Sequence, residues 1–550
     1  MRSEVLALHI AAGGLAGILS CGALLATAQN RPSYARTPAS GTTSGPYRIA
    51  GVLVNAATDE PVRRATVEAL TEGDSRAVAS CVTDNEGHFA LAGLAAAKYQ
   101  LTASKRGFRT AFYDEHDEFS TAIVTGPDQD TTQLRFKLTP GAVLRGAVTG
   151  DDGEPVASAR VMLFQKPKHP VLGVRTAQVD ATVTDDTGAY EFGNLAAGEY
   201  LLAVMAEPWY AVHEGSPTKR NPALDVAYPV TYFDSTTEEG SATPLVLAGG
   251  SREEANISLH AVPALHIRVS SPGRPEQAGN VPNLQQTVFG LPVGLEGGGT
   301  ISADRPNDAT EISGIAPGHY ELTQGYRILD LDLLSNLQVD PNAGSAALAV
   351  TGRLRMASGA PVPGDPTITL ARMDSGSGQP VFAAQAHRGR FTIDGVPAGQ
   401  WAVLATGDGI SIPVLAVSAG GPQLAGNIVT LRDRGADLVV TLSDAETRIE
   451  GFARKDGKGF AGAMIVLLPR NPALWKALTR RDQSDSDGSF ALQNVAPGEY
   501  TVVAIEDGWP IDWTSPEAMS RYLPAGTSVT VSDKSSSPIH LASPVTVETP

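Results

Sequence analysis

Apolar and polar residues alternate along most of the chain, in short runs separated by turn residues. One phrase recurs five times, and each copy is centred on one apolar residue: Leu94, Leu195, Ile315, Val396 or Val495. Each copy reads apolar, any, apolar, then a turn, then aromatic, any, apolar, as in "SFALQNVAPGEYTV". A period of two puts alternate side chains on one face of a strand. Each copy therefore predicts two half-buried strands joined by a turn.

Two kinds of turn accompany the phrase. In "NVAPGEY", Pro497 fixes φ and Gly498 can supply a positive φ, so the pair predicts a type II turn between the two strands. In front of the phrase, "TDNEG", "TDDTG" or "SDSDG" predicts a second turn that closes the preceding hairpin. Both turns would join neighbouring strands of a small sheet.

The repeat has the length of a small β domain. The five copies lie about 80 to 120 residues apart, far more than the repeat of a solenoid. A strand, a turn with "EPV" or "APV" and an alternating strand precede most copies, and at least one more strand follows. Six or seven short strands per unit predict a two-sheet sandwich. The fold class is therefore all-β, with about five tandem antiparallel Ig-like sandwiches.

The predicted organisation follows from these repeats. In order, we expect a signal peptide over 1–28, a linker over 29–46 and sandwiches over 47–140, 141–262, 263–347 (a divergent copy), 348–445 and 446–550. Short connections such as "LTPGAVL" predict small interfaces between consecutive sandwiches. Helix is scarce, but "NPALWKALTRRDQ" and "SPEAMSRYL" predict two short helical insertions. Ser515 would cap the second, with Pro516 in its first turn.

The repeat resembles a known domain. Its motif, "G-x-F-x-L-x-x-[LV]-x-x-G-x-Y-x-[LV]" after "G-x-V-x-x-x-x-G-x-P-V", is similar to that of the carboxypeptidase regulatory-like domain, a transthyretin-like or prealbumin-like sandwich. The resemblance covers nearly all of the chain beyond the leader and is weakest in the third copy. "TYFDSTTEEGSATPLVLAGG" and "SPEAMSRYLPAGTSVTVSD" also resemble stretches of multi-repeat exported proteins of acidobacteria. The resemblance implies accessory or adhesive modules, and the wider fold superfamily includes starch-binding modules.

The first residues indicate export. Arg2, an apolar run from Val5 to Ala26 and the small residues before Gln29 are typical of a cleavable signal peptide. The same run is long enough to anchor the chain in a membrane, and "ILSC" resembles a lipoprotein box that would place a lipid on Cys21. We expect no transmembrane span once the signal is removed. The predicted location is secreted, or periplasmic and associated with the outer membrane.

Charge and cysteine content narrow the partners. The chain has 42 Lys and Arg against 59 Asp and Glu, and its net charge of −17 repels nucleic acid. Cys81 is the one cysteine beyond the leader, so the mature chain can form no internal disulfide. We therefore expect no nucleic acid partner and sandwiches that are stabilised by their own cores.

The sequence lacks the motifs of common enzymes. The ten histidines stand singly, without the spacing of a zinc site, and no G-x-S-x-G elbow, P-loop or dinucleotide fingerprint occurs. We expect no catalytic residue, no cofactor, no metal and no enzymatic activity. The acidic loop "DQSDSDGSF" lacks the distal glutamate of a calcium loop and aligns with "TDNEG" and "TDDTG". It is therefore interpreted as a turn.

Carbohydrate binding has a physical basis, because sugar rings stack on exposed aromatic side chains. The loop after the second phrase strand carries such residues in two sandwiches: Trp209 and Tyr210 in the second, and Trp509, Trp513 and Tyr522 in the fifth. The alternative is that these aromatics cover the open end of each sandwich.

The leading hypothesis is an exported, non-enzymatic scaffold or adhesion protein of the cell envelope or extracellular space. Its partner would be an unidentified protein or polysaccharide at the cell surface. The alternative is a carbohydrate-binding protein that uses the loop aromatics. A third possibility, an accessory subunit of a peptidase or an outer-membrane system, follows from the resemblance alone.

Overall fold

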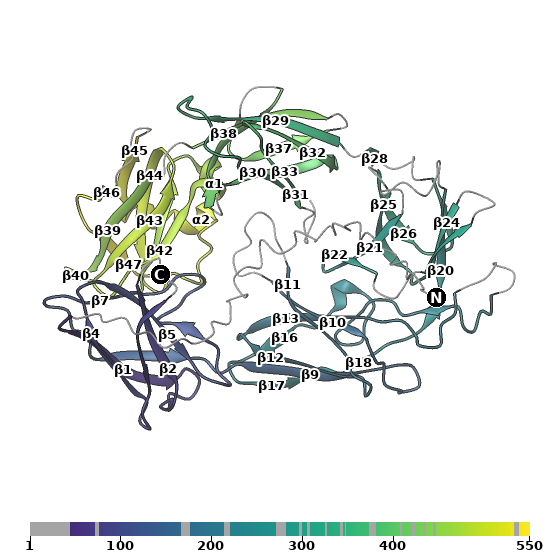
Figure 1. The fold of residues 1–550 in the computed structure, drawn as a ribbon, viewed down its shortest axis with the longest axis horizontal. Coiled ribbons are helices and arrows are strands. Elements are labelled where there is room, and N and C mark those ends of the chain that lie inside the picture. The colour runs from purple at the N-terminus through teal and green to yellow at the C-terminus, as the bar shows by residue number, and fades with distance from the viewer. Residues whose placement is uncertain are drawn as a thin grey trace, which may run out of the picture. The chain divides into compact units, whose positions relative to one another are not determined.

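The computed structural model describes most of the chain beyond its leader, and nearly all of its regular structure is β-strand (Figure 1). The described residues are 45–71, 76–166, 176–213, 220–270, 282–295, 300–304, 309–324, 327–340, 345–346, 348–372, 381–407, 410–420, 424–432, 435–443, 447–532 and 538–550. The predicted signal peptide, Cys21 and nearly all of the linker lie outside these residues. The prediction of an all-β fold built from tandem sandwiches is confirmed.

The first two sandwiches each pack one sheet on another. In the first sandwich, one sheet contains β4 (His88–Leu94), β1 (Tyr47–Asn55) and β8 (Leu134–Leu138). The other sheet contains β3 (Ala77–Val82), β2 (Thr66–Thr71), β5 (Lys98–Ser104), β6 (Ala111–Phe112) and β7 (Ile123–Val124). In the second sandwich, one sheet contains β12 (Ala189–Leu195), β9 (Ala142–Thr149), β17 (Arg252–Glu254) and β18 (Ile257–Ser258). The other sheet contains β11 (Ala177–Val183), β10 (Arg160–Gln165), β13 (Gly198–Met205), β15 (Thr231–Tyr232) and β16 (Leu245–Leu247). A small ribbon follows, β14 (Val226–Ala227) with β19 (Val262–Pro263).

The third and fourth sandwiches repeat this plan. In the third sandwich, one sheet contains β23 (Thr300–Asp304), β24 (Ala309–Ile315), β20 (Leu265–Ser270) and β27 (Leu337–Val339). The other sheet contains β22 (Leu291–Gly294), β21 (Asn283–Val288), β25 (Gly318–Gln324), β26 (Arg327–Leu333) and β28 (Ser345–Ala346). In the fourth sandwich, one sheet contains β32 (Arg390–Val396), β29 (Leu348–Met356), β38 (Ala436–Leu442), β35 (Val414–Ala419) and β36 (Leu424–Ala425). The other sheet contains β31 (Val381–Gln385), β30 (Thr367–Arg372), β33 (Gly399–Gly407), β34 (Ile410–Ile412) and β37 (Ile428–Leu431).

In the fifth sandwich, one strand joins the two layers into a single sheet. Its strands are β39 (Thr447–Lys455), β40 (Lys458–Gly459), β41 (Met464–Pro469), β42 (Arg480–Gln483), β43 (Ser489–Val495), β44 (Gly498–Ile505), β45 (Thr527–Val531), β46 (Ile539–His540) and β47 (Val545–Glu548). The joining strand is β47, which pairs in parallel with both β39 and β44.

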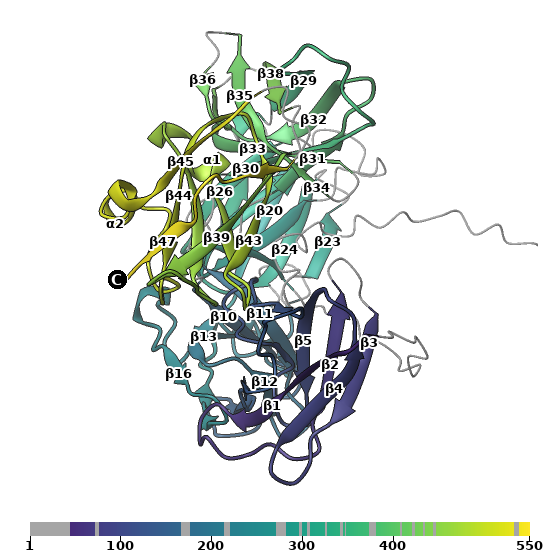
Figure 2. The same cartoon turned by 90° about the vertical axis from the view of Figure 1, so that its left-hand side faces the viewer.

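Two short α-helices interrupt the fifth sandwich, as the sequence predicts (Figure 2). They are α1 (Trp475–Leu478) and α2 (Pro516–Met519), and the hydroxyl of Ser515 accepts the Ala518 N–H to cap α2. Single 3₁₀ turns span Glu239–Ser241, Pro472–Leu474 and Leu523–Ala525. Among the residues that the structure describes, no helix is long and apolar enough to cross a bilayer.

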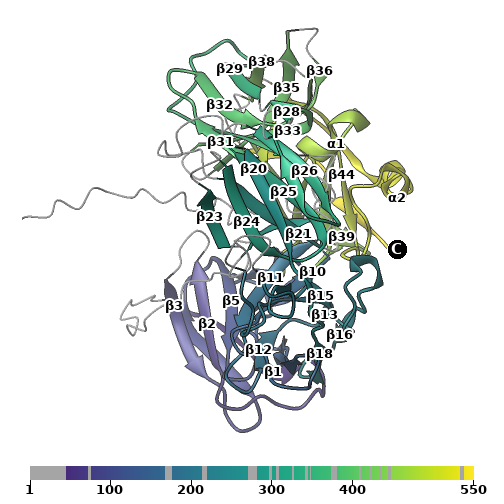
Figure 3. The same cartoon turned by 90° about the vertical axis from the view of Figure 1, so that its right-hand side faces the viewer.

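Figure 3 shows the strands of the sandwiches from the side. In each sandwich, alternate residues along the strands point inward and form a core between the two layers. β29 shows the pattern most fully, because its residues are buried and exposed in strict alternation. The five apolar residues on which the repeats align are all buried, each in a different core: Leu94, Leu195, Ile315, Val396 and Val495. The repeated phrase therefore supplies the centre of each core.

The aromatic residue of each copy makes one further contact, a hydrogen bond to the carbonyl four residues earlier. Tyr99, Tyr200, Tyr320 and Tyr500 donate through the hydroxyl, over 3.1, 2.9, 2.7 and 2.8 Å. Trp401 stands in their place in the fourth copy, and its indole Nε1 donates to Pro397 O over 3.1 Å. A buried aromatic side chain with a polar tip is needed here, since phenylalanine would leave the carbonyl without this donor.

The turn chemistry differs from the prediction. The strands before and after the Pro-Gly segment, such as β43 and β44, have different pairing partners, so the segment leads from one layer to the other. The φ of Gly498 is 159°, an extended value, so the type II turn was wrong. The turn before the phrase also changes sheets instead of closing a hairpin, because β3 pairs with β2 while β4 pairs with β1.

The positive φ occurs one residue before the central apolar residue. Gly93, Asn194, Gly314, Gly395 and Asn494 have φ between 52° and 83°, and the pairing register of each strand skips at this point. A bulge whose extra residue is left-handed favours glycine or asparagine. This bulge turns the end of the strand toward the opposite sheet.

Every sandwich contains parallel pairing between an early and a late strand. The first strand of each sandwich runs parallel to a late strand: β1 with β8, β9 with β17 and β18, β20 with β27, β29 with β38, and β39 with β46 and β47. The two strands come from opposite ends of the same segment of chain. Periodicity in the sequence cannot reveal this, because it shows which face is buried and not which strand lies alongside.

The aromatic hydrogen bond yields a first prediction. Tyr500→Phe leaves the Ala496 carbonyl without its donor, and we expect the fifth sandwich to lose about 1–2 kcal/mol of unfolding free energy. Native-state hydrogen exchange of peptides from β43 and β44 measures this loss. Tyr210→Phe, at a half-buried tyrosine outside the repeat, serves as the matched control. Equal exchange in both variants would contradict the role of the bond.

Candidate functional site

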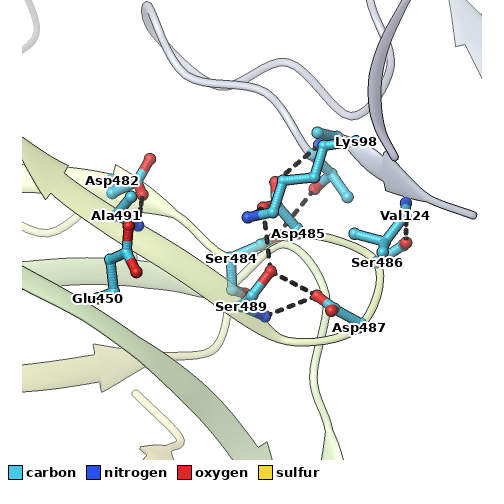
Figure 4. Close-up of polar contacts among 12 residues, drawn as sticks. Lys98, Val124, Glu450, Asp482, Ser484, Asp485, Ser486, Asp487, Ser489 and Ala491 are labelled. Atoms are coloured by element: carbon cyan, nitrogen blue, oxygen red, sulfur yellow. Dashed lines mark hydrogen bonds and ion pairs between the residues drawn. The ribbon is translucent and has the colours of Figure 1, made fainter. Parts of the chain in front are cut away.

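A dense group of polar contacts forms a dock between the first and fifth sandwiches (Figure 4). The turn between β42 and β43 lies against the outer edge of β7. Lys98 Nζ of the first sandwich contacts Asp485 Oδ2 at 2.5 Å, and the Ala122 N–H donates to Asp485 Oδ1 over 3.1 Å. The Ser486 N–H donates to Ala122 O over 2.9 Å, and the Val124 N–H donates to Ser486 Oγ over 2.8 Å. These contacts join residues more than 360 positions apart in the chain.

The docking turn is the fifth-sandwich version of a repeated turn. In three copies, the hydroxyl of Thr83, Thr184 or Ser484 accepts one backbone N–H and donates to one backbone carbonyl of the "EPV" region or its equivalent. This pair of bonds holds the turn onto the preceding strand. The shared geometry means that the same carboxylate position can be compared in the three sandwiches.

The next residue is an aspartate in all three turns, but its role changes. Asp84 and Asp185 each accept backbone N–H groups of their own turn. In the fifth sandwich Asp487 accepts the Ser489 N–H over 2.9 Å instead. Asp485 is thereby available to the first sandwich, and its side chain is 12% exposed where that of Asp84 is 53% exposed.

A second group of contacts surrounds Gln483. Its Nε2 donates to Asp114 O over 2.6 Å and to Thr121 Oγ1 over 2.7 Å, and its Oε1 lies 3.2 Å from Nδ1 of His116. Thr121 Oγ1 in turn donates to Asp114 Oδ2 over 2.9 Å. Gln483 is almost fully buried, so the amide exchanges water for partners on the first sandwich.

Arg481 forms the third group. Its guanidinium pairs with Asp117 at 3.0 Å and Glu118 at 3.1 Å, both in the first sandwich. It also lies over the rings of Phe119 and Trp513, 5.1 and 4.5 Å from their centroids. The Arg481 side chain is 8% exposed, and cation–π contacts of a desolvated arginine are worth on the order of 2 kcal/mol.

The structure places the fifth-sandwich aromatics away from the exposed platform that sugar stacking needs. Trp509 and Tyr522 are buried, at 7% and 3% exposure, and Trp513 is half-buried. Trp509 stacks on His116 of the first sandwich with centroids 5.0 Å apart and rings 5° from parallel. Their faces are already occupied by protein, which is the covering role named as the alternative.

The second-sandwich aromatics are different. Trp209 is 84% exposed and meets Tyr210 edge-on, with ring centroids 5.8 Å apart. These two residues therefore keep an open ring face, although the loop corresponds to the one that carries Trp509.

Burial changes the acidity of the docking turn. Burial raises the pKa of Asp485, while Lys98 beside it acts in the opposite direction. Burial also raises the pKa of Asp482 to about 7, against hydrogen bonds from the backbone N–H groups of Ala491 and Gln483. Asp482 therefore changes charge near neutral pH.

A buried ionic cluster that the sequence analysis missed joins the second and third sandwiches. Asp225 bridges two histidines, with Oδ1 3.0 Å from Nδ1 of His213 and Oδ2 2.9 Å from Nε2 of His266. The other ring nitrogens lie 3.4 Å from Glu207 and Glu311. Burial raises the pKa of Asp225, but the bonds from the histidines outweigh it and the net pKa is lowered. The histidines are more than 50 residues apart, so no spacing signal could reveal them.

Metal ligands converge at one place in the described part of the chain. Asp84, Glu86 and His88 bring potential ligand atoms within 4.8 Å of one another, and all three are exposed. Asp84 already accepts the N–H groups of the other two, over 3.0 and 2.8 Å, so the turn itself accounts for the grouping. Asp482, Asp485 and Asp487 are likewise engaged by N–H, hydroxyl or ammonium groups.

Comparison with known proteins identifies the class of two sandwiches. Residues 48–139 and 143–224 each match the model of the carboxypeptidase regulatory-like domain. The chain therefore contains two tandem copies of this domain. No curated protein matches the chain.

Solved structures give a distant likeness. The TIE protein of Bacillus anthracis is 11% identical over 88% of this chain and 68% of its own, with a TM-score of 0.15. The minor pilin GBS52 of Streptococcus agalactiae is 15% identical over 42% of this chain and 100% of its own, at 0.19. The major pilin subunit BcpA of Bacillus cereus is 13% identical over 73% of this chain and 98% of its own, at 0.13. Scores this low do not establish a common arrangement of domains.

The pKa of Asp482 yields a prediction for stability. Because the folded state raises this pKa, the group stabilises the fold fully below its unfolded pKa near 4 and loses that contribution as pH rises through 7. We expect the unfolding free energy of the fifth sandwich to fall by up to about 3 kcal/mol between pH 5 and pH 8.5 from this group. Urea unfolding read by hydrogen exchange of β43 measures the change.

Two variants isolate that effect. Asp482→Asn should remove this pH dependence. The unfolding free energy of wild type minus that of the variant should therefore decrease from pH 5 to pH 8.5. Asp185→Asn is the control, because hydrogen bonds lower the pKa of Asp185 and its titration falls below the range. If the difference in unfolding free energy between wild type and Asp482→Asn stays constant from pH 5 to 8.5, the raised pKa of Asp482 is contradicted.

Proposed function

We propose that the chain is a non-catalytic scaffold or adhesion protein, exported to the cell envelope or beyond. The observation that supports this most is the dock, where buried polar side chains bind another sandwich. In an enzyme, such groups would converge on a cavity open to substrate. Lys98, Arg481, Gln483 and Asp485 instead have partners across the dock.

The domain class supports the same proposal. Two sandwiches are carboxypeptidase regulatory-like domains, and the three further sandwiches repeat their central phrase. A row of such modules presents many loops, and a contact between the first and the fifth module limits their relative motion. Holding surfaces in a fixed relation is what a scaffold must do.

The dock can be tested in the full chain with paired cysteines. A backbone hydrogen bond joins Ala122 and Ser486, which brings their Cα atoms within disulfide range. We expect Ala122→Cys with Ser486→Cys, in a background of Cys21→Ser and Cys81→Ser, to form an intramolecular disulfide that mass spectrometry maps to these two peptides. The control pair is Ala122→Cys with Asp186→Cys, at the equivalent turn of the second sandwich. A disulfide in the control, or none in the first pair, would contradict the dock.

Export and the lack of catalysis need a separate experiment. We expect an epitope-tagged chain in a bacterial host to fractionate outside the cytoplasm and to be cut by protease added to spheroplasts. Purified chain should show no turnover on panels of ester, peptide and glycoside substrates. Retention in the cytoplasm would refute export, and turnover that persists through purification would refute the non-catalytic assignment.

A second candidate function, carbohydrate binding, is favoured by the exposed ring face of Trp209. We expect Trp209→Ala and Tyr210→Ala each to abolish retention on insoluble polysaccharides, since either change removes a ring on which a sugar would stack. Val212→Ala is the matched control, because Val212 is a half-exposed apolar residue of the same loop. Retention that none of the three changes affects would remove this candidate.

A further inference from the structure

The first-sandwich half of the dock is the edge of a sheet. β7 pairs with β5 along one side, and its other side meets the turn of the fifth sandwich. There the Ala122 and Val124 N–H groups and the Ala122 carbonyl bond to Asp485 and Ser486. An edge with free N–H and C=O groups is a template for another chain. When the dock opens, three backbone groups of this edge lose these hydrogen-bond partners, and Lys98 loses its contact with the Asp485 carboxylate.

Each half belongs to a sandwich with its own core. The core around Leu53 and Phe136 lies in the first sandwich, and the core around Ile465 and Phe490 lies in the fifth. Neither half therefore needs the other in order to fold. The dock combines ion pairs and hydrogen bonds with the stacking of Trp509 on His116, so the two separated halves are complementary in charge and in shape.

We propose that this dock also forms between two copies of the chain, with the fifth sandwich of each copy seated on the first sandwich of the other. The inference rests on the dock used in the proposed function and adds a partner to it. The exchange keeps every contact and doubles it by two-fold symmetry, so both copies close without leaving a free edge. The partner chemistry is set by β7, which requires a carboxylate and a hydroxyl on adjacent residues, as Asp485 and Ser486 supply.

The balance between one copy and two depends on concentration. Within one chain, the tether gives the fifth sandwich a high effective concentration near the first, on the order of millimolar for a matched span. The closed single copy therefore predominates in dilute solution. Exchange follows when the dock opens at high concentration, or when a variant weakens the intramolecular pairing more than the intermolecular one.

Single cysteines test the exchange with small changes. One protein carries Ala122→Cys and another carries Ser486→Cys, both with Cys21→Ser and Cys81→Ser, so neither can form the disulfide within its own chain. After the two are mixed at high concentration and oxidised mildly, we expect a species of twice the mass that links these two peptides. In the control mixture, the second protein carries Asp186→Cys instead of Ser486→Cys. We expect no disulfide between residues 122 and 186 and no species of twice the mass in this control.

Charge reversal provides an independent reading. Lys98→Glu puts two acids at the dock, and Asp485→Lys puts two bases there, so each variant alone should be monomeric in sedimentation equilibrium. In an equal mixture, the unaltered Asp485 of one protein meets the unaltered Lys98 of the other, and the two introduced residues are also opposite in charge. We expect the mixture to double in mass, and the chain with both changes to be monomeric because its own dock is restored.

The outcomes separate the two proposals. If the cysteine pair within one chain forms its disulfide but neither mixture dimerises, the dock stands and exchange between copies is refuted. If the pair within one chain also fails, the dock and the function built on it are refuted together. A loss of sheet signal in the circular dichroism of a charge variant would leave the cysteine mixtures as the deciding measurement, because each cysteine replaces one small side chain and leaves the ion pair between Lys98 and Asp485 in place.

Discussion

Each sandwich depends on a polar bond at the point where the chain leaves one layer for the other. The buried tyrosine, or Trp401 in the fourth copy, fills the core with its ring and donates its polar tip to a carbonyl of the crossing segment. One side chain thus supplies apolar area to the core and a hydrogen-bond donor to a backbone carbonyl of the crossing segment. A left-handed glycine or asparagine just before the crossing gives the strand its bend. The two features together explain why the phrase recurs with so little change.

The dock uses the same repeated turn for a different purpose. The hydroxyl of Ser484 keeps the structural role of Thr83 and Thr184, so the turn retains its shape. Asp487 takes over the capping of the turn, and Asp485 is buried against Lys98. A few substitutions in an otherwise structural loop are thus enough to convert a solvent-facing turn into a binding surface.

Much of the fold could be predicted from the sequence, because alternation of apolar residues reports burial directly and the phrase repeats. The buried positions Phe490 and Tyr500 and the cap at Ser515 follow from local signals. What local signals could not supply were pairings between distant segments. The sequence therefore leaves open whether Trp509 is exposed or covers the end of its sandwich, and it gives no sign that His116, nearly 400 residues earlier, stacks on its ring. The left-handed position was also misplaced, since Pro-Gly is a stronger turn signal than a single asparagine.

The parallel pairing of early and late strands has a mechanical consequence. A pull on the two ends of a sandwich draws its first and last strands past each other along their length, so their hydrogen bonds are loaded together in shear. In the fourth sandwich, β29 and β38 share a register of seven residue pairs, from Val350 with Ala436 to Met356 with Leu442. Forced unfolding is governed by the height of the unfolding barrier and not by equilibrium stability. This strand order therefore suits a sandwich that bears tension between its two ends.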